Sequence, residues 1–183
     1  MGNKPVKYGA GSAAFFICAV VFSFLTAACA TVDPLYTTPG PDGSQLLFAR
    51  PFSVACRRCA VSGVSLDMTV PTVDRSLTGN PVVNYSVTVP KSAVAAADTV
   101  SVQFVSGEAA YETMNRALIF RSLKGSSSVV VRYTSELGKD DFTALLHSRQ
   151  LLQIRLAFSD GTEITLDSPE LNRRFDSLRL LLL

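Results

Sequence analysis

Apolar and polar residues alternate along several short segments of this chain, a pattern typical of β-strands that bury one face. The alternation covers residues 64–70, 81–90, 98–107 and 127–135, and a shorter example covers residues 44–50. The residues expected on buried faces include Val64, Leu66, Met68, Val70, Val83, Tyr85, Val87, Val89, Val100, Val102 and Phe104. Because the segments are also rich in β-branched and aromatic residues, the sequence predicts a β-rich core.

The strongest local signal is a hairpin over residues 151–168. Alternating apolar residues stand on both sides of Ser159-Asp160-Gly161. An Asp-Gly pair between two such runs favours a tight turn that joins antiparallel strands. The residues expected to share its buried face are Leu152, Ile154, Leu156, Phe158, Ile164 and Leu166. Further turns are expected at Gly79-Asn80-Pro81 and Gly125-Ser126.

Two internal segments have apolar residues at helical spacing and are predicted to be helices. They are residues 107–118, with Tyr111, Met114 and Leu118 on one face, and residues 139–149, with Phe142, Leu145 and Leu146 on one face. Asp140 is the candidate N-cap of the second segment. Asp140 and Asp141 are adjacent and do not face each other across a substrate bond, so they fit a helix start better than a catalytic pair.

The C-terminal residues 167–183 carry a helix start signal and an apolar face. Ser168 is a candidate N-cap, Pro169 fits the first helical position, and Glu170 fits the first turn. The apolar stripe consists of Leu171, Phe175, Leu178 and Leu182. For the final four leucines, Leu180 to Leu183, we expect packing on the chain's own sheet, with a groove on a partner as the alternative.

These patterns together predict a mostly β, α+β fold. We expect one β-rich domain over residues 46–183, with an antiparallel, β-sandwich-like sheet and two or three helices, including the C-terminal amphipathic helix. The length of 183 residues suits one such domain together with a leader.

The first part of the chain has the features of a secretory signal. Lys4 and Lys7 provide a basic start, residues 9–32 carry no charge, and the apolar centre covers residues 13–25. The small residues Thr26, Ala27 and Ala28 follow, where a signal peptidase would act. Residues 1–28 are therefore predicted to be a signal peptide. An uncharged run of about twenty residues also fits a retained transmembrane anchor, which is the alternative.

The end of this leader can be interpreted in two ways. Ala28-Cys29-Ala30 fits cleavage after Ala30, which would release a soluble secreted or periplasmic protein. The segment Leu25-Thr26-Ala27-Ala28-Cys29 resembles the lipobox of bacterial lipoproteins, in which small residues precede a cysteine that becomes the lipidated N-terminus. Here the leucine stands four residues before the cysteine rather than three, and Thr26 takes the usual leucine position.

The lipoprotein resemblance implies a triacylated Cys29, and several acyl chains hold a protein firmly on a membrane. In that family an aspartate after the cysteine commonly signals inner-membrane retention. Residue 30 is an alanine, so the resemblance implies the periplasmic face of the outer membrane. Residues 29–45 are rich in Pro, Gly, Thr and Ser and are predicted to form a lipidated N-terminus and flexible tether.

The charge balance argues against nucleic-acid binding. Lys4 and Lys7 are the only charged residues before Cys29, so loss of the leader leaves 15 of the 17 basic residues against 15 acidic ones. Binding to nucleic acid or to an anionic membrane surface requires clustered Lys and Arg. We therefore expect the partners to be the membrane, through the lipid anchor, and another envelope protein.

Cys56 and Cys59 form a C-x-x-C motif. In an exported protein a local disulfide is the simplest interpretation. The alternative is a thiol–disulfide redox site, in which Arg57 and Arg58 would stabilise a thiolate. Such a site needs a helix after the motif, whereas residues 60–70 indicate a turn and a strand. A zinc site needs two further ligands, and His147 is the only histidine.

No other motif points to catalysis or to a cofactor. His147 adjoins Ser148, but the chain has no G-x-S-x-G elbow and no phosphate-binding glycine loop. His147 is expected to be a surface or cap residue. Asn84 begins a glycan-acceptor pattern, yet it lies within a predicted strand. The leading hypothesis is a non-enzymatic, lipid-anchored domain that binds or scaffolds an envelope component, and the alternative is an exported redox protein or other enzyme centred on Cys56 and Cys59.

Overall fold

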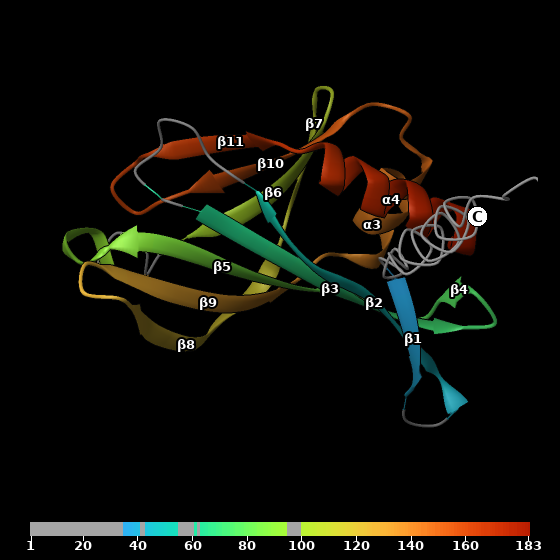
Figure 1. The fold of residues 1–183 in the computed structure, drawn as a ribbon. Coiled ribbons are helices and arrows are strands. Elements are labelled where there is room, and N and C mark those ends of the chain that lie inside the picture. The colour runs from blue at the N-terminus through green and yellow to red at the C-terminus, as the bar shows by residue number, and fades with distance from the viewer. Residues whose placement is uncertain (1–34, 41–42, 55–60, 62, 95–99) are drawn as a thin grey trace, which may run out of the picture. The chain divides into compact units, whose positions relative to one another are not determined.

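Two antiparallel sheets in a sandwich-like arrangement form most of the computed structural model (Figure 1). It describes residues 35–40, 43–54, 61, 63–94 and 100–183, all within the unit that spans residues 34–183. The larger sheet contains β1 (Leu35–Pro39), β2 (Gln45–Val54), β3 (Gly63–Val73), β4 (Ser76–Leu77), β5 (Val82–Pro90), β8 (Met114–Lys124) and β9 (Ser128–Glu136). The smaller sheet contains β6 (Ser101–Ser106), β7 (Ala109–Glu112), β10 (Leu152–Ala157) and β11 (Glu163–Asp167).

The order of the strands carries the chain from one sheet to the other. The larger sheet runs β1-β2-β3-β5-β9-β8, with β4 paired to β3, and the smaller sheet runs β11-β10-β6-β7. The chain leaves the larger sheet after β5, forms β6 and β7, and returns through β8 and β9. The predicted mostly β, antiparallel, sandwich-like fold is confirmed.

The alternating segments bury the faces that the sequence predicted. In β3 and β5 every second residue is buried, from Val64 to Val70 and from Val83 to Val89. The smaller sheet contributes Val102 and Phe104 to the same core. Strands with one apolar face are stable only when that face is covered, and here each sheet covers the other.

The predicted hairpin is present as β10 and β11. Ile154 lies opposite Leu166 and Leu156 lies opposite Ile164, so the expected face is shared and buried. Gly161 in the turn has a φ of 82°, which a glycine adopts without strain. The backbone N–H of Thr162 donates to the Asp160 carboxylate and lowers the pKa of Asp160. Stabilisation from this bond is present at neutral pH and is lost as the pH falls through the lowered pKa.

In the described chain the α-helices are α3 (Lys139–His147) and α4 (Pro169–Leu182), and a short 3₁₀ helix, η2 (Lys91–Ala93), follows β5. Ser168 caps α4 as predicted, because its Oγ accepts a hydrogen bond from the Leu171 N–H at 3.4 Å. α3 buries its predicted stripe of Phe142, Leu145 and Leu146, and α4 buries three of its four predicted residues, Leu171, Phe175 and Leu178, while Leu182 is partly buried. The N-cap of α3 is Gly138, and Asp140 lies in the first turn.

The helix predicted over residues 107–118 is wrong. This segment forms β7 and the start of β8, and Met114 and Leu118 are exposed by 44% and 48%. Gly107 turns the chain with a φ of 62°, and β7 then pairs with β6 while β8 pairs with β9. Hydrogen bonding to two existing strand edges outweighs a helical spacing of three apolar residues.

Two further expectations need correction. Leu180, Leu181 and Leu183 are exposed by 86%, 38% and 66%, so only Leu182 of the final four leucines packs partly against the core. The tether predicted over residues 29–45 is also shorter than expected, because residues 35–39 form β1 and pair with β2. The folded domain therefore begins before residue 46.

Candidate functional site

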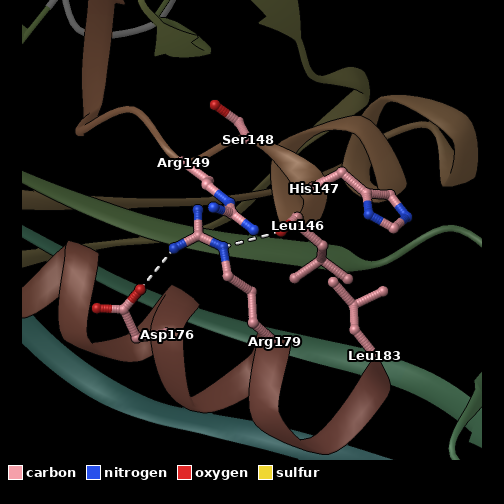
Figure 2. A pocket seen from close by; sticks show the side chains of 7 residues that line it. All are labelled: Leu146, His147, Ser148, Arg149, Asp176, Arg179 and Leu183. Atoms are coloured by element: carbon pink, nitrogen blue, oxygen red, sulfur yellow. Dashed lines mark hydrogen bonds and ion pairs between the residues drawn. The ribbon is translucent and has the colours of Figure 1, made fainter.

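A cavity of about 370 Å³ lies where the C-terminal ends of α3 and α4 approach each other (Figure 2). The residues that line it are Leu146, His147, Ser148, Arg149, Asp176, Arg179 and Leu183. Two guanidinium groups, an imidazole and a carboxylate therefore reach one concave surface. Positive groups of this kind can bind an anion. Whether this cavity does so depends on the hydrogen bonds and ion pairs that each side chain already makes.

The guanidinium of Arg179 is committed to holding α3 and α4 together. Its Nε donates to the carbonyl of Leu146 at 2.9 Å, and its Nη2 donates to the carbonyl of Leu145 at 3.2 Å. Its Nη1 pairs with the Asp176 carboxylate at 2.5 Å. The last carbonyls of a helix have no partners within the helix, and a cation there also interacts favourably with the helix dipole. Arg179 is thus a structural cap of α3.

Replacing Arg179 with alanine is expected to lower the free energy of unfolding by about 1.5 kcal/mol, because two charge-assisted bonds to helix carbonyls disappear. The control is Arg173→Ala on the same helix, since the Arg173 side chain is 74% exposed and forms a surface ion pair with Glu170. Its effect is expected to stay within about 0.5 kcal/mol. Urea denaturation measures both, and equal losses would contradict the capping role.

His147 and Ser148 do not form a nucleophile–base pair in this cavity. His147 is the exposed last residue of α3, in agreement with the surface role predicted for it. The Ser148 side chain points away from the imidazole (Figure 2), and its Oγ lies 2.5 Å from the Oγ of Ser106. Base catalysis needs the imidazole within hydrogen-bond reach of the hydroxyl, so the geometry gives this pair no catalytic role.

A polar network lies on the face of the larger sheet that points away from the core. The Asp67 carboxylate pairs with Arg132 at 2.5 Å and accepts a hydrogen bond from Asn84 Nδ2 at 2.8 Å. Arg132 also donates to Ser86 Oγ at 3.1 Å. The groups satisfy one another across β3, β5 and β9. Asn84, the first residue of the glycan-acceptor pattern, therefore lies within a strand with its amide nitrogen engaged.

A second polar group lies inside the sandwich, at the carbonyl of Val100. Tyr85 donates its hydroxyl to this carbonyl at 3.1 Å, and Arg116 Nη1 donates to it at 2.7 Å. The rings of Tyr85 and Tyr133 stack with centroids 5.4 Å apart. Burial raises the pKa of Tyr85 well above its usual value. The phenol therefore keeps its proton at neutral pH and acts as a structural donor.

The most unusual surface is on β8, where all 11 residues are exposed although the strand pairs with β9. Leu118, Ile119, Phe120 and Leu123, here named the β8 strip, are exposed by 48%, 48%, 44% and 68%. Figure 1 shows β8 outside β9, at the margin of the larger sheet. Sequence reasoning missed this strip because it placed Leu118 on a helix. The sequence feature that could have revealed it is the uninterrupted apolar run of residues 117–120 before the Gly125 turn.

The three cysteines singled out by the sequence, Cys29, Cys56 and Cys59, lie outside the described residues. Cys56 and Cys59 belong to the connection between β2 and β3, whose flanking residues Val54 and Val64 are paired. Their predicted disulfide, and the lipidation predicted for Cys29, stay predictions.

Within the described ranges, no group of three or more His, Cys, Asp or Glu side chains is placed to hold a metal ion. The described helices also include none that is long and apolar enough to cross a membrane. Comparison of the chain with family models, with curated proteins and with solved structures finds no match. The candidate site is therefore judged on its own geometry, which favours the β8 strip over the cavity between α3 and α4.

Proposed function

We propose that this chain is a lipid-anchored protein of the bacterial cell envelope whose β-sandwich binds or scaffolds another envelope protein without catalysing a reaction. The observation that carries the binding role is the β8 strip, four adjacent or nearly adjacent apolar side chains that stay exposed on a folded domain. Exposed apolar residues scattered singly are ordinary on a protein surface, whereas several exposed together on one strand support an interaction site. The polar groups described above serve structural roles, which supports binding rather than chemistry.

The anchoring role rests on the leader. Its basic start, its uncharged apolar run and the small residues before Cys29 support export followed by acylation of that cysteine. Only five residues separate Cys29 from Leu35, where β1 begins. Since an extended chain spans at most about 3.5 Å per residue, the lipidated end lies within roughly 20 Å of β1. The domain would work close to the membrane surface, on the periplasmic face of the outer membrane.

Replacing Cys29 with alanine is expected to abolish incorporation of radiolabelled palmitate, because the Cys29 Sγ is the atom that would carry the diacylglyceryl group, and the amino group of the same residue would carry the third acyl chain. The matched control is Cys18→Ala, which lies in the leader and should leave the label unchanged. Labelling followed by immunoprecipitation from a bacterial host measures both variants. Label that persists in the Cys29 variant, or that never appears in the unaltered chain, would reject the anchor.

A further inference from the structure

The outer face of the larger sheet carries a second apolar surface at its β1 end. Tyr36 on β1 lies opposite Phe48 on β2, and Leu46 on β2 lies opposite Pro71 on β3. Each of these residues adjoins a buried residue on its own strand, so their side chains point away from the core. Together with Val73, which follows on the same face of β3, they are here named the β1 patch. Tyr36 and Val73 are exposed by 43% and 40%, and the other three residues are partly exposed.

Aromatic and cationic groups are stacked at one side of the β1 patch. The rings of Tyr36 and Phe48 have centroids 5.1 Å apart and an interplanar angle of 13°. The guanidinium carbon of the exposed Arg50 lies 5.1 Å from the centre of the Tyr36 ring. Tyrosine rings gather where an apolar surface meets water, and a stacked guanidinium can donate its in-plane N–H groups to phosphate. This combination is typical of protein surfaces at the headgroup level of a bilayer.

The proposed anchor would hold the β1 patch near a bilayer. Tyr36 is seven residues after Cys29. An extended chain spans at most about 3.5 Å per residue, so Tyr36 lies within about 25 Å of an acylated Cys29. Contact between the patch and that bilayer is then an intramolecular event, because the tether supplies a high effective concentration. A weak apolar contact is sufficient in that case, without the cluster of basic residues that an unanchored protein needs on an anionic membrane.

The size of the β1 patch also favours a bilayer over a second protein. A stable protein interface contains about 20 to 30 residues on each side. The patch has only its five apolar residues, and three of these are partly buried against the sheet. The headgroup region of a bilayer is hydrated, so the backbone groups at the open edge of β1 keep hydrogen-bond partners there, which a hydrocarbon interior would not provide.

The two apolar surfaces of the larger sheet lie at its opposite ends. The strand order is β1-β2-β3-β5-β9-β8, so five steps of about 4.8 Å separate β1 from β8 by roughly 24 Å along the sheet. A domain that rests on the membrane at β1 therefore holds the β8 strip away from the lipid, where a protein partner can reach it.

We propose that the β1 patch rests on the headgroup region of the phospholipid bilayer to which the chain is anchored. The Tyr36 and Phe48 rings contact the boundary between headgroups and acyl chains, and Arg50 donates to lipid phosphates. The inference rests on the proposed anchoring, and it adds to it the orientation of the domain on the membrane.

The test uses the absence of tryptophan from the chain, because a single introduced indole then reports only its own surroundings. The full chain is purified from bacterial membranes in detergent and inserted into preformed phosphatidylcholine vesicles, with or without brominated acyl chains that quench indole fluorescence on contact. The variant Tyr36→Trp is expected to lose most of its emission in the brominated vesicles. The matched control is Phe120→Trp on β8, which starts from a similar exposure of 44% and should keep its emission.

A second pair of variants tests whether the apolar surface makes the contact. Val73→Glu places a carboxylate in the β1 patch, and in the Tyr36→Trp background it is expected to restore most of the emission. Leu123→Glu makes the same change of charge on β8, at a position that is 68% exposed, and should leave the quenching unchanged. Circular dichroism and thermal unfolding confirm that each variant is folded.

Flotation of the vesicles on a density gradient separates failure of this inference from failure of the anchor. A chain that floats with the vesicles while Tyr36→Trp stays unquenched, or is quenched no more than Phe120→Trp, would overturn the proposal and leave the anchor intact. So would a dimer of the unaltered chain that Val73→Glu dissociates, because a second copy would then cover the patch. A chain that neither floats nor incorporates palmitate would reject the anchor, and the proposal with it.

Discussion

Replacing Phe175 with alanine is expected to lower the free energy of unfolding by about 4 kcal/mol. The Phe175 side chain is 1% exposed and lies 5.9 Å from the ring of Phe104 and 6.0 Å from the ring of Phe142, measured between centroids. It therefore joins α4 to both the smaller sheet and α3. Its removal loses the burial of an aromatic ring, leaves a cavity and ends two aromatic contacts. Urea denaturation followed by circular dichroism measures the loss.

Leu180→Ala is the matched control for Phe175→Ala, because Leu180 is on the same helix and is 86% exposed. Its effect is expected to stay within about 0.5 kcal/mol. The loss of unfolding free energy in Phe175→Leu should fall between the losses in Phe175→Ala and Leu180→Ala. If Phe175→Ala cost no more than Leu180→Ala, the packing of α4 against the sandwich described here would be wrong.

Replacing Asp67 with alanine is expected to lower the free energy of unfolding by about 2.5 kcal/mol. The change removes the partner of Arg132 and the acceptor for Asn84, on a sheet face where the Asp67 and Arg132 side chains are 14% and 23% exposed. Partial exposure keeps the cost below that of breaking a fully buried pair. Urea denaturation at neutral pH measures it.

The control for Asp67→Ala is Thr69→Ala, two residues along the same face of β3. It should lower the free energy of unfolding by less than about 1 kcal/mol, as an ordinary surface change does. The double variant Asp67→Ala/Arg132→Ala should lose less than the sum of the two single variants, since the second change removes the charge that the first left unpaired. Strict additivity would contradict the coupling.

The sequence predicted the parts of the fold that depend on local pattern. The period of two in β3 and β5, the Asp160-Gly161 turn between β10 and β11, and the Ser168 cap of α4 were each visible because neighbouring residues alone determine them. Together these local signals predicted the mostly β, sandwich-like fold class.

The wrong predictions concern residues whose conformation depends on distant partners. The segment of β7 and β8 has helical spacing in Tyr111, Met114 and Leu118, yet β6 and β9 offer strand edges that only the tertiary fold brings near. The final leucines also could not be placed from spacing, because α4 already covers its contact area with Leu171, Phe175 and Leu178. The candidate site was missed for the same reason, since a strand can be recognised as an edge strand only when the pairing of strands in the folded sheet is known.

We propose above all that the mature protein begins at an acylated Cys29 and presents a β-sandwich near the membrane. The most direct measurement is intact-protein and N-terminal peptide mass spectrometry of the chain extracted from bacterial membranes. We expect a mature N-terminus at Cys29 that carries a diacylglyceryl group on Sγ and a third acyl chain on its amino group. An unmodified N-terminus at Thr31, or a chain that retains the leader, would contradict it.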